Sequence, residues 1–519
     1  MTNLSQKKIL ILDCQTTGMH PSTGYLLQIG WSIVAPSTLH EFEIEKWTLK
    51  LPKDEAIPSK IKKMLHLTEA GLARSVEPTI VFEKLQNVLK ELGPEPIVLA
   101  HYAQFENRFL KKFYLEQRQT DELNFKLLCT QKIAKRLLPH LPSHNLKAVA
   151  GYFKWPNSPK NEINSHVSMT IHVWLQLLPK LFEQNIACSN CLEAWLATKY
   201  TNKNQGAYHY NIERLERLKL SNKPGIYRML AEDGTILYIG KATSLKARVN
   251  SYFRGTKNRD RRKLEMLTQV WDIETIECDT PLEAALLESD EIKKWTPPYN
   301  VLLKSDSRSL IYYNDDYSKY NADKSSIFIH GPYKTYDALA ILIELFNAFK
   351  TQVNIGYGEE QITPETLNSA YSLFCAWHQL NHQSIESLSI RSSLVIGYKL
   401  LKQFEKVHGK GAFQKWWTNE KKKNSEDELV IEEKIAHKMA RILIRAAEAK
   451  RKNRMILRLS NATLLIQSPQ KKLTLKNGEL IQHAFNQPMN ERSGSLDLRH
   501  YDRLSILLSA LNKKTITLI

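Results

Sequence analysis

The stretch GIYRMLAEDGTILYIGKA, from Gly225 to Ala242, gives the most specific indication of the fold. Two β-rich runs flank Asp233-Gly234, a dipeptide that favours a tight β-hairpin turn. The stretch therefore predicts two adjacent strands that bring Tyr227 and Tyr238 close together at one face of a small sheet. Helical segments follow, so residues 221–305 are expected to form one compact unit of mixed α/β structure.

Three blocks in and after this hairpin resemble the GIY-YIG nuclease domain of the UvrC family. They are PGIYRM, LYIGKATSLKARVNSYF and TPLEAALLESDEIKKWTPPYNVLLKSD. Their shared order and spacing make chance agreement very improbable. The similarity continues through IHGPYKTYDALAILIELFNAF, as in UvrC and in its shorter relative Cho. The resemblance implies a metal-dependent endonuclease that hydrolyses a phosphodiester bond.

One carboxylate, Glu288, is the metal ligand that this resemblance implies. Glu288 falls on an amphipathic helix beside Ala284, Ala285 and Leu287, a setting that would hold the carboxylate rigidly. A single hard cation such as Mg²⁺ or Mn²⁺ suits a lone carboxylate supplemented by waters and a phosphate oxygen. A solvated helix acid is the alternative interpretation of Glu288 taken by itself.

Tyrosines are the other part of the implied site. By the same resemblance, Tyr227 would be the general base that activates water, although a free phenol has a pKa of about 10. Nearby Lys241 and a metal-bound water would favour the phenolate, because positive charge stabilises it. The remaining members would orient water and phosphate, bind the scissile phosphate and tie the domain together: Tyr238, Tyr252, Arg248 and Asn300. Singly, each could be a packing or surface residue; the ordered set favours catalysis.

A basic segment follows this set. RGTKNRDRRK contains six lysines and arginines, and its position beside the implied site favours contact with DNA phosphates over a merely solvated loop. The six residues are Arg254, Lys257, Arg259, Arg261, Arg262 and Lys263.

Residues 7 to about 180 alternate short β-rich runs with helical stretches, which predicts an α/β domain. The expected strands are KKILILD, LLQIGWSIV and PIVLAH, and the expected helices are TIVFEKLQNVLKEL and FENRFLKKFYLEQ. ILDCQTTG, LAHYAQFENRFL and NSHVSMTIHVW resemble, in order, motifs of the DnaQ-like (DEDDh) exonucleases. The resemblance implies an RNase H-like exonuclease fold for residues 1–182.

The metal-binding positions of this exonuclease-like region are partly lost. That family cuts with two metal ions held by four carboxylates, and a histidine serves as base. Carried over, Asp13 is retained and His166 fits the histidine. Gln15 is neutral, Glu106 has one methylene too many, and Ile171 cannot bind a metal. We therefore expect this region to keep the exonuclease fold without exonuclease activity.

Residual 3′–5′ exonuclease activity stays open as an alternative for this region, with His172 or Glu162 as substitute ligands. A groove shaped for a strand end could also bind DNA or a partner protein without cutting.

Composition points to a multidomain nucleic-acid-binding protein. A chain of 519 residues suggests two to four domains, and 73 Lys and Arg against 54 Asp and Glu leave a net charge of +19. Such an excess suits a polyanionic partner, although a merely soluble basic protein is the alternative. No apolar run approaches the length of a membrane span and no secretory signal is recognised, so a bacterial, nucleoid-associated cytoplasmic location is expected. Cys188 and Cys191 form one CxxC, for which a surface or half-buried pair is favoured over zinc.

The remaining residues divide by composition. Residues 183–220 read as a linker around a short helix, and 306–455 as a mostly helical extension of the UvrC/Cho type. The runs MILRLSNATLLIQ and KKLTLKNGELIQ, the second with a turn at Asn477-Gly478, predict a small β-containing unit over 456–519. Cys375 alone stands where UvrC has a four-cysteine cluster segment, so no metal cluster is expected there.

Together these features predict a damage- or structure-specific DNA endonuclease of nucleotide excision repair. Its expected partners are double-stranded DNA, damaged or distorted, with UvrB and UvrA as possible protein partners by family analogy. One alternative is a bifunctional nuclease with residual exonuclease activity, and another is a non-catalytic DNA-binding scaffold.

Overall fold

The structure, a computed structural model, divides into two compact units. The first comprises Met1–Glu277 and Pro297–Asn300, and the second comprises Cys278–Thr296 and Val301–Ile519. The residues that it describes are 3–35, 42–53, 55–156, 162–200, 208–254, 260–300, 309–335, 338–350, 355–357, 360–381, 388–409, 412–413, 430–467, 470–480 and 496–519.

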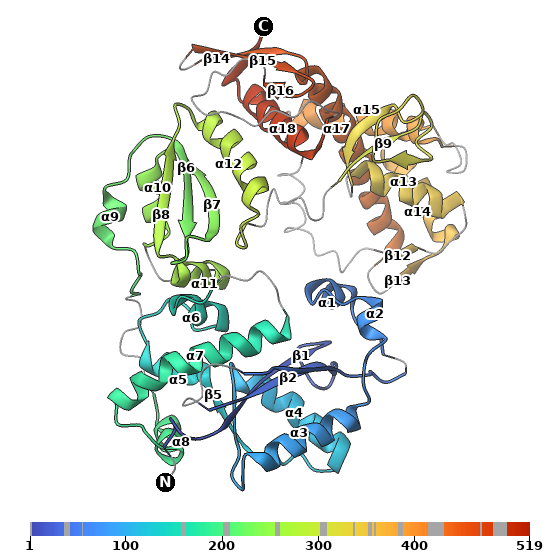
Figure 1. Ribbon diagram of the computed structural model, residues 1–519. Helices are drawn as coiled ribbons and strands as arrows, with labels where there is room; N and C mark the ends of the chain where they lie inside the picture. The colour runs from blue at the N-terminus through green and yellow to red at the C-terminus, as the bar shows by residue number, and fades with distance from the viewer. Residues whose placement is uncertain are drawn as a thin grey trace. The chain divides into compact units, whose positions relative to one another are not determined.

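A five-stranded mixed sheet in the order β3-β2-β1-β4-β5 organises the exonuclease-like region (Figure 1). β1 pairs antiparallel with β2 and parallel with β4, and β4 continues parallel to β5. The strands are β1 (Ile9–Thr16), β2 (Leu26–Val34), β3 (Glu45–Thr48), β4 (Ile97–Ala100) and β5 (Lys126–Cys129). The strand order and directions agree with the RNase H-like fold class, which confirms that prediction.

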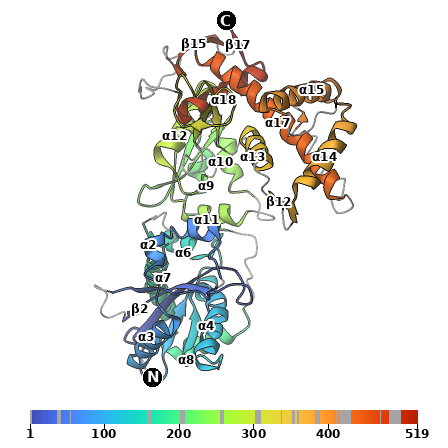
Figure 2. The same cartoon turned by 90° about the vertical axis from the view of Figure 1, so that its right-hand side faces the viewer.

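Side chains of β1 alternate between two hydrophobic cores. Ile9 and Ile11 lie in the core on the side of α5 and α7, whereas Leu10 and Leu12 lie in the core on the side of α3 and α4. Because helices cover both faces (Figures 1 and 2), the strand is apolar up to Asp13. The helices are α1 (Ser59–Met64), α2 (Glu69–Leu72), α3 (Pro78–Glu91), α4 (Ala103–Arg118), α5 (Thr130–Leu137), α6 (Leu146–Tyr152), α7 (Ile163–Glu183) and α8 (Ser189–Ala197).

The predicted hairpin is confirmed in the second part of this unit. β6 (Gly225–Leu230) and β7 (Ile236–Ala242) pair antiparallel around Gly234, whose φ of +80° suits glycine. β8 (Asp272–Glu277) completes a three-stranded sheet in the order β7-β6-β8. The accompanying helices are α9 (Arg214–Leu218), α10 (Leu245–Ser251) and α11 (Arg261–Gln269).

The second unit begins with α12 (Pro281–Trp295), whose N-terminus is capped by the Thr280 hydroxyl accepting from the Glu283 amide. A long helix, α17 (Ile431–Leu459), packs against α13, α14 and α15 (Figure 2). These are α13 (Ala338–Lys350), α14 (Pro364–Trp377) and α15 (Ile390–His408). The mostly helical character predicted for this region is confirmed.

Two small sheets in this helical region were not predicted. The first has the order β10-β9-β11, and the second is a hairpin of β12 and β13. Their strands are β9 (Leu310–Tyr313), β10 (Tyr320–Asn321), β11 (His330–Lys334), β12 (Ile355–Tyr357) and β13 (Glu360–Ile362).

A four-stranded antiparallel sheet in the order β16-β15-β14-β17 forms the C-terminal β unit together with α18 (Leu498–Asn512). Its strands are β14 (Thr463–Gln467), β15 (Gln470–Lys476), β16 (Glu479–Leu480) and β17 (Ile516–Leu518). The turn at Asn477-Gly478 is confirmed, since both residues have positive φ between β15 and β16. The strand predicted from MILRLSNATLLIQ was too long, because Met455–Leu459 forms the end of α17.

Cys188 and Cys191 form a disulfide at the start of α8. The CxxC is therefore neither a zinc site nor a simple pair of thiols. The other four cysteines, Cys375 among them, are free and buried.

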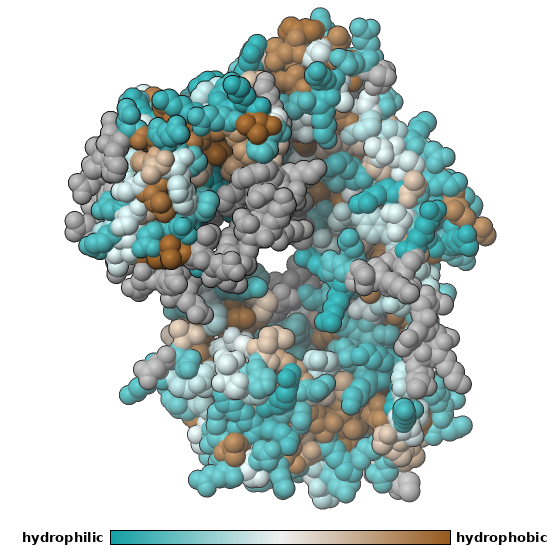
Figure 3. Space-filling view, turned by 180° about the vertical axis from the view of Figure 1, so that it is seen from behind, coloured by the Kyte–Doolittle hydropathy of each residue, from teal (hydrophilic) through white to brown (hydrophobic). Residues whose placement is uncertain are grey.

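Hydrophilic residues cover most of the described part of the face shown in Figure 3, with hydrophobic residues in separate groups. Among the described residues, no helix is both long and apolar enough to cross a bilayer.

Candidate functional site

Three tyrosines from two strands and one helix end gather in the hairpin domain. The rings of Tyr227 on β6 and Tyr238 on β7 lie 6.2 Å apart, and the ring of Tyr252, at the end of α10, is 6.0 Å from the first and 6.2 Å from the second. The Tyr227 and Tyr252 hydroxyls share a hydrogen bond of 2.9 Å. The predicted proximity of Tyr227 and Tyr238 is therefore observed.

Gly240 makes room for this cluster. It lies opposite Tyr227 in the β6–β7 ladder. A Cβ atom at this position would stand 2.3 Å from the Tyr227 hydroxyl oxygen. The absence of a side chain at Gly240 thus leaves space for the Tyr227 hydroxyl, and Gly240 was not among the residues predicted from the sequence. The signal was its place directly across the strands from a tyrosine.

Burial dominates the electrostatics of the cluster. Tyr227 is fully buried, and this burial raises the pKa of its phenol strongly; the neighbouring Tyr252 and Tyr238 phenols raise it further, whereas Arg248 acts in the opposite direction. The guanidinium carbon of Arg248 lies 5.2 Å from the centre of the Tyr252 ring. Tyr227 is therefore a neutral phenol at neutral pH, next to a cation that could pair with a phosphate.

Asn300 fixes the middle of β7. Its side-chain oxygen accepts from the Ile239 amide at 3.0 Å, and its side-chain nitrogen donates to the Ile239 carbonyl at 2.9 Å. Both groups are buried, so Asn300 stabilises the strand next to Tyr238. Lys241, also on β7, is exposed.

Glu288, the predicted metal ligand, lies on α12 in the second unit and is 8% exposed. The described residues contain no group of three or more His, Cys, Asp or Glu side chains that could hold a metal ion. A protein-only cage is therefore excluded for this part of the chain. A single carboxylate fits Mg²⁺ or Mn²⁺, since these hard ions keep several waters and accept oxygen ligands from a substrate phosphate.

The basic segment is described in part. Arg254 is exposed before the gap at 255–259, and Lys257 and Arg259 lie outside the described residues. Exposed Arg261, Arg262 and Lys263 form the first turn of α11. Arg262 also has a structural role, because it donates to the Pro298 carbonyl at 2.9 Å.

The exonuclease-like positions gather at the end of the apolar run of β1. Asp13, Gln15 and Glu106 are buried, and the Asp13 carboxylate lies 3.3 Å from Nδ1 of His166 on α7. Burial raises the pKa of Glu106 well above its usual range, and the negative charge of Asp13 raises it further. Ile171 belongs to the hydrophobic core. Asp13 therefore contacts His166, and its charge acts on the buried Glu106, but among the described residues these side chains do not form a group that could hold a metal ion.

His172 does not act as the substitute ligand. Its Nε2 atom is 2.8 Å from the Phe153 carbonyl oxygen, and its ring packs on Trp155 with centroids 5.1 Å apart. Glu162 precedes the first residue of α7 as its N-cap, and its side chain makes no capping hydrogen bond.

Comparisons with known proteins agree with the central assignment. The family described as the UvrC-like GIY-YIG domain matches residues 223–301. A protein of Mycobacterium tuberculosis named as a bifunctional exonuclease/endonuclease is 27% identical over 316 residues, which cover 57% of this chain and 45% of that protein. The UvrABC system protein C of Caldanaerobacter subterraneus is 44% identical over 140 residues, which cover 25% of this chain and 22% of that protein. The resemblance predicted from the sequence is confirmed.

Parts of the chain are similar to solved structures. The GIY-YIG domain of UvrC from Thermotoga maritima, bound to magnesium, is 33% identical and covers 17% of this chain and 94% of that chain, with a TM-score of 0.16. Exonuclease I of Escherichia coli in complex with a dT13 oligonucleotide is 14% identical and covers 43% of this chain and 48% of that chain, with a TM-score of 0.31. The matched region spans less than half the length of the curated relatives.

Proposed function

We propose that this protein is a DNA endonuclease whose GIY-YIG domain hydrolyses one phosphodiester bond in damaged or distorted duplex DNA. The observation that carries the proposal is the tyrosine cluster: Tyr227 packed across from Gly240, hydrogen-bonded to Tyr252 and flanked by Tyr238 and Arg248. A sheet core needs neither a hydrogen bond between two phenols nor an adjacent arginine. The match of residues 223–301 to the UvrC-like domain supports the same reading.

In this proposal Glu288 would hold one Mg²⁺ or Mn²⁺ ion, which supplies positive charge to the phosphate and lowers the pKa of water. Arg248 binds the scissile phosphate, and Lys241 assists the base. The side chains of Tyr238 and Tyr252 orient water and phosphate. The basic residues around the start of α11 hold the DNA backbone.

Tyr227 receives the proton of the attacking water. Because burial keeps its phenol protonated, it can do so only while it passes on its own proton. The Tyr252 hydroxyl, 2.9 Å away and only partly buried, offers that acceptor. One proton enters at the Tyr227 oxygen as another leaves toward Tyr252 and then solvent.

The biological setting is proposed from the resemblance. The cut would lie on the 3′ side of a lesion in nucleotide excision repair in the bacterial cytoplasm, after UvrA and UvrB have opened the site. The names of several relatives refer to the UvrABC system, which supports testing these two partners first.

Incision of a defined lesion duplex, with and without UvrA and UvrB, tests the proposal. We expect wild type to cut the damaged strand once, and Glu288→Ala to bind the duplex without cutting. Equal cutting by both proteins, or none by wild type under any of these conditions, would overturn it.

Residual 3′–5′ exonuclease activity is the second candidate. The contact between Asp13 and His166 and the buried Glu106 favour it, as does the name of the M. tuberculosis relative. Gln15 and Ile171 argue against two-metal chemistry. An assay with DNA labelled at its 3′ end, on Glu288→Ala protein, tests this second candidate. Any trimming of the 3′ end that remains must come from the exonuclease-like region.

A further inference from the structure

One side of α12 packs against the C-terminal β unit, and Glu288 lies on another side. Leu282, Leu286 and Asp290 recur every four residues and share one side of the helix, whereas Glu288 lies about 200° around the axis from Leu286. Whatever holds the first side therefore sets the rotation of the helix, and with it the direction of the Glu288 carboxylate.

The C-terminal β unit covers the first side of α12. Leu286 is 1% exposed and lies in one hydrophobic core with Leu459, Leu464 and Leu504, and Leu282 packs against the same core. Apolar contact alone would tolerate some sliding, because it has no preferred direction.

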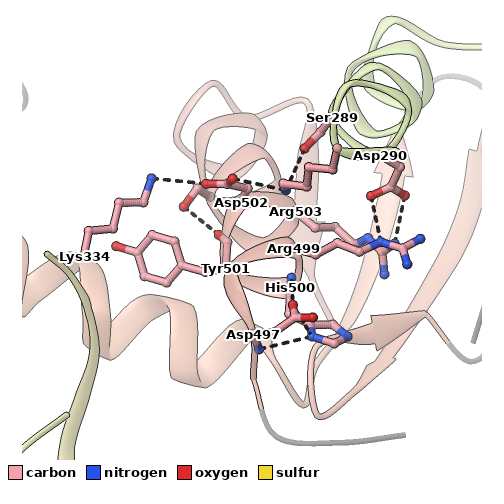
Figure 4. A network of polar contacts seen from close by, with 11 residues as sticks. Ser289, Asp290, Lys334, Asp497, Arg499, His500, Tyr501, Asp502 and Arg503 are labelled. Atoms are coloured by element: carbon pink, nitrogen blue, oxygen red, sulfur yellow. Dashed lines mark hydrogen bonds and ion pairs between the residues drawn. The ribbon is translucent and has the colours of Figure 1, made fainter. Parts of the chain in front are cut away.

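Ion pairs add direction to this contact (Figure 4). The two carboxylate oxygens of Asp290 receive Arg499 Nε at 3.2 Å and an Arg503 guanidinium nitrogen at 2.9 Å. The side chains of Asp290 and Arg503 are only 12% and 6% exposed. This arrangement, one carboxylate paired with two arginines and called the fork below, fixes both the distance and the angle between α12 and α18.

A second chain of charges lies one helical turn further along α12. Lys293 pairs with Asp502 of α18 at 3.1 Å, and Asp502 also pairs with Lys334 of β11 at 3.1 Å. The Asp502 side chain is 3% exposed. Removal of one partner would leave a buried charge without compensation, which is strongly unfavourable.

We propose that α18 positions the metal-binding helix: the fork of Asp290 with Arg499 and Arg503 sets the rotation of α12, and thereby the place of the Glu288 carboxylate. Asp290 and Arg503 are positioning residues, and the C-terminal β unit is a functional part of the nuclease. The inference rests on the proposed function, since the role of Glu288 as metal ligand comes from there.

Direct Mn²⁺ binding to the full chain, measured by the electron paramagnetic resonance of free Mn²⁺, tests this inference beside nicking of supercoiled DNA. Asp290→Asn should raise the apparent Kd for Mn²⁺ by about tenfold, the scale seen when groups that orient a ligand are removed. Nicking should fall at limiting Mn²⁺ and recover at high Mn²⁺, with DNA binding unchanged. Arg503→Gln should behave alike, and Arg503→Lys should keep part of the affinity.

Asp315→Asn is the matched control, because it removes the same charge from an exposed ion pair with Arg391. It should leave Mn²⁺ binding and nicking unchanged. Arg499→Gln is the milder variant if Asp290→Asn does not fold, since Arg499 is 34% exposed.

The inference would be overturned if folded Asp290→Asn and Arg503→Gln proteins bound Mn²⁺ as tightly as wild type and needed the same Mn²⁺ concentration for nicking. Unchanged Mn²⁺ binding by a Glu288→Gln protein would overturn it as well. The proposed function fails separately, when wild type does not nick DNA. Mn²⁺ binding that is lost in Glu288→Gln and weakened in Asp290→Asn would still support the positioning role in that case.

Discussion

Tyr227 combines complete burial with a hydrogen bond to a second phenol. Tyr227→Phe keeps the ring and removes the hydroxyl that the proposal uses for proton transfer. We expect its nicking rate to fall by about 10²–10⁴-fold, the usual contribution of a general base. Plasmid nicking at saturating Mn²⁺ measures this effect.

Tyr114→Phe is the control for that substitution. Tyr114 is also fully buried and its hydroxyl also has hydrogen-bond partners, Gln86 and Asn124, but it lies in the exonuclease-like region. It should keep wild-type nicking. An equal loss in both variants would mean that the Tyr227 hydroxyl matters only for stability.

Glu106 is predicted to oppose folding at neutral pH. Its folded pKa is raised by burial and then by Asp13, whereas an unfolded Glu titrates near pH 4.3. Below that pH both states hold the proton; as the pH rises above it, only the unfolded chain releases its proton, so stability falls. Glu106→Gln should therefore raise Tm at pH 8, by at least about 2 °C, and change it little near pH 3.5.

Glu116→Gln, on the exposed side of the same helix, is the control and should not shift Tm. A lower Tm for Glu106→Gln at pH 8, above all when Mn²⁺ stabilises wild type, would instead indicate a working metal site.

Strand β7 shows how a strand prepares the site without contributing chemistry. Gly240→Ala would place a methyl group 2.3 Å from the Tyr227 hydroxyl oxygen. The ring must move, so we expect nicking to be lost together with about 1–3 kcal/mol of stability. Nicking assays and thermal melts of the same preparation measure both.

Gly234→Ala provides the comparison on the same hairpin. Its φ of +80° makes alanine strained, but nothing lies within 4 Å of the added Cβ atom. It should lose stability by about 1 kcal/mol or more and keep nicking activity. Full nicking by Gly240→Ala would show that the tyrosine cluster tolerates displacement.

Helices and strands whose residue pattern fits only one type of secondary structure could be predicted from the sequence. The apolar run of β1 between two cores and the hairpin at Asp233-Gly234 were recognised because local residues determine them. Met455–Leu459 was misread as a strand, since a short apolar run fits a buried helix end equally well. The strands β9 to β13 were missed, because they are two to five residues long and lie within a region whose pattern is mostly helical.

At the scale of the molecule, the exonuclease-like region packs on the GIY-YIG domain through α6 and α11. The Asn145 side-chain amide donates to Glu265 of α11, and the Ser143 amide donates to Thr268 at 3.1 Å. A Cβ atom on Gly151 of α6 would stand 2.5 Å from the Gln269 side chain. The exonuclease-like region therefore supports α11, the helix that carries part of the basic segment.

Gly151→Ala should loosen this contact. We expect faster hydrogen exchange in α6 and α11 and a lower Tm, although alanine normally favours a helix. Gly71→Ala, in the exposed helix α2, should be neutral or stabilising. Unchanged exchange in α11 of Gly151→Ala would contradict the supporting role.

The contact between α12 and α18 could not be predicted. Asp290 and Arg503 are 213 residues apart, and each reads as an ordinary helix-surface charge until the fold buries them against each other. The tyrosines, Arg248 and Glu288 could be named as candidates from the sequence because they fall within short ordered blocks. Coupling between distant segments leaves no such local pattern.

The most direct measurement is Mn²⁺-dependent nicking of supercoiled plasmid by wild type, Glu288→Ala and Asp13→Ala. The first should nick, the second should not, and the third should match wild type, because the proposed endonuclease centre does not use the exonuclease-like positions. Nicking that survives Glu288→Ala and disappears in Asp13→Ala would contradict the account.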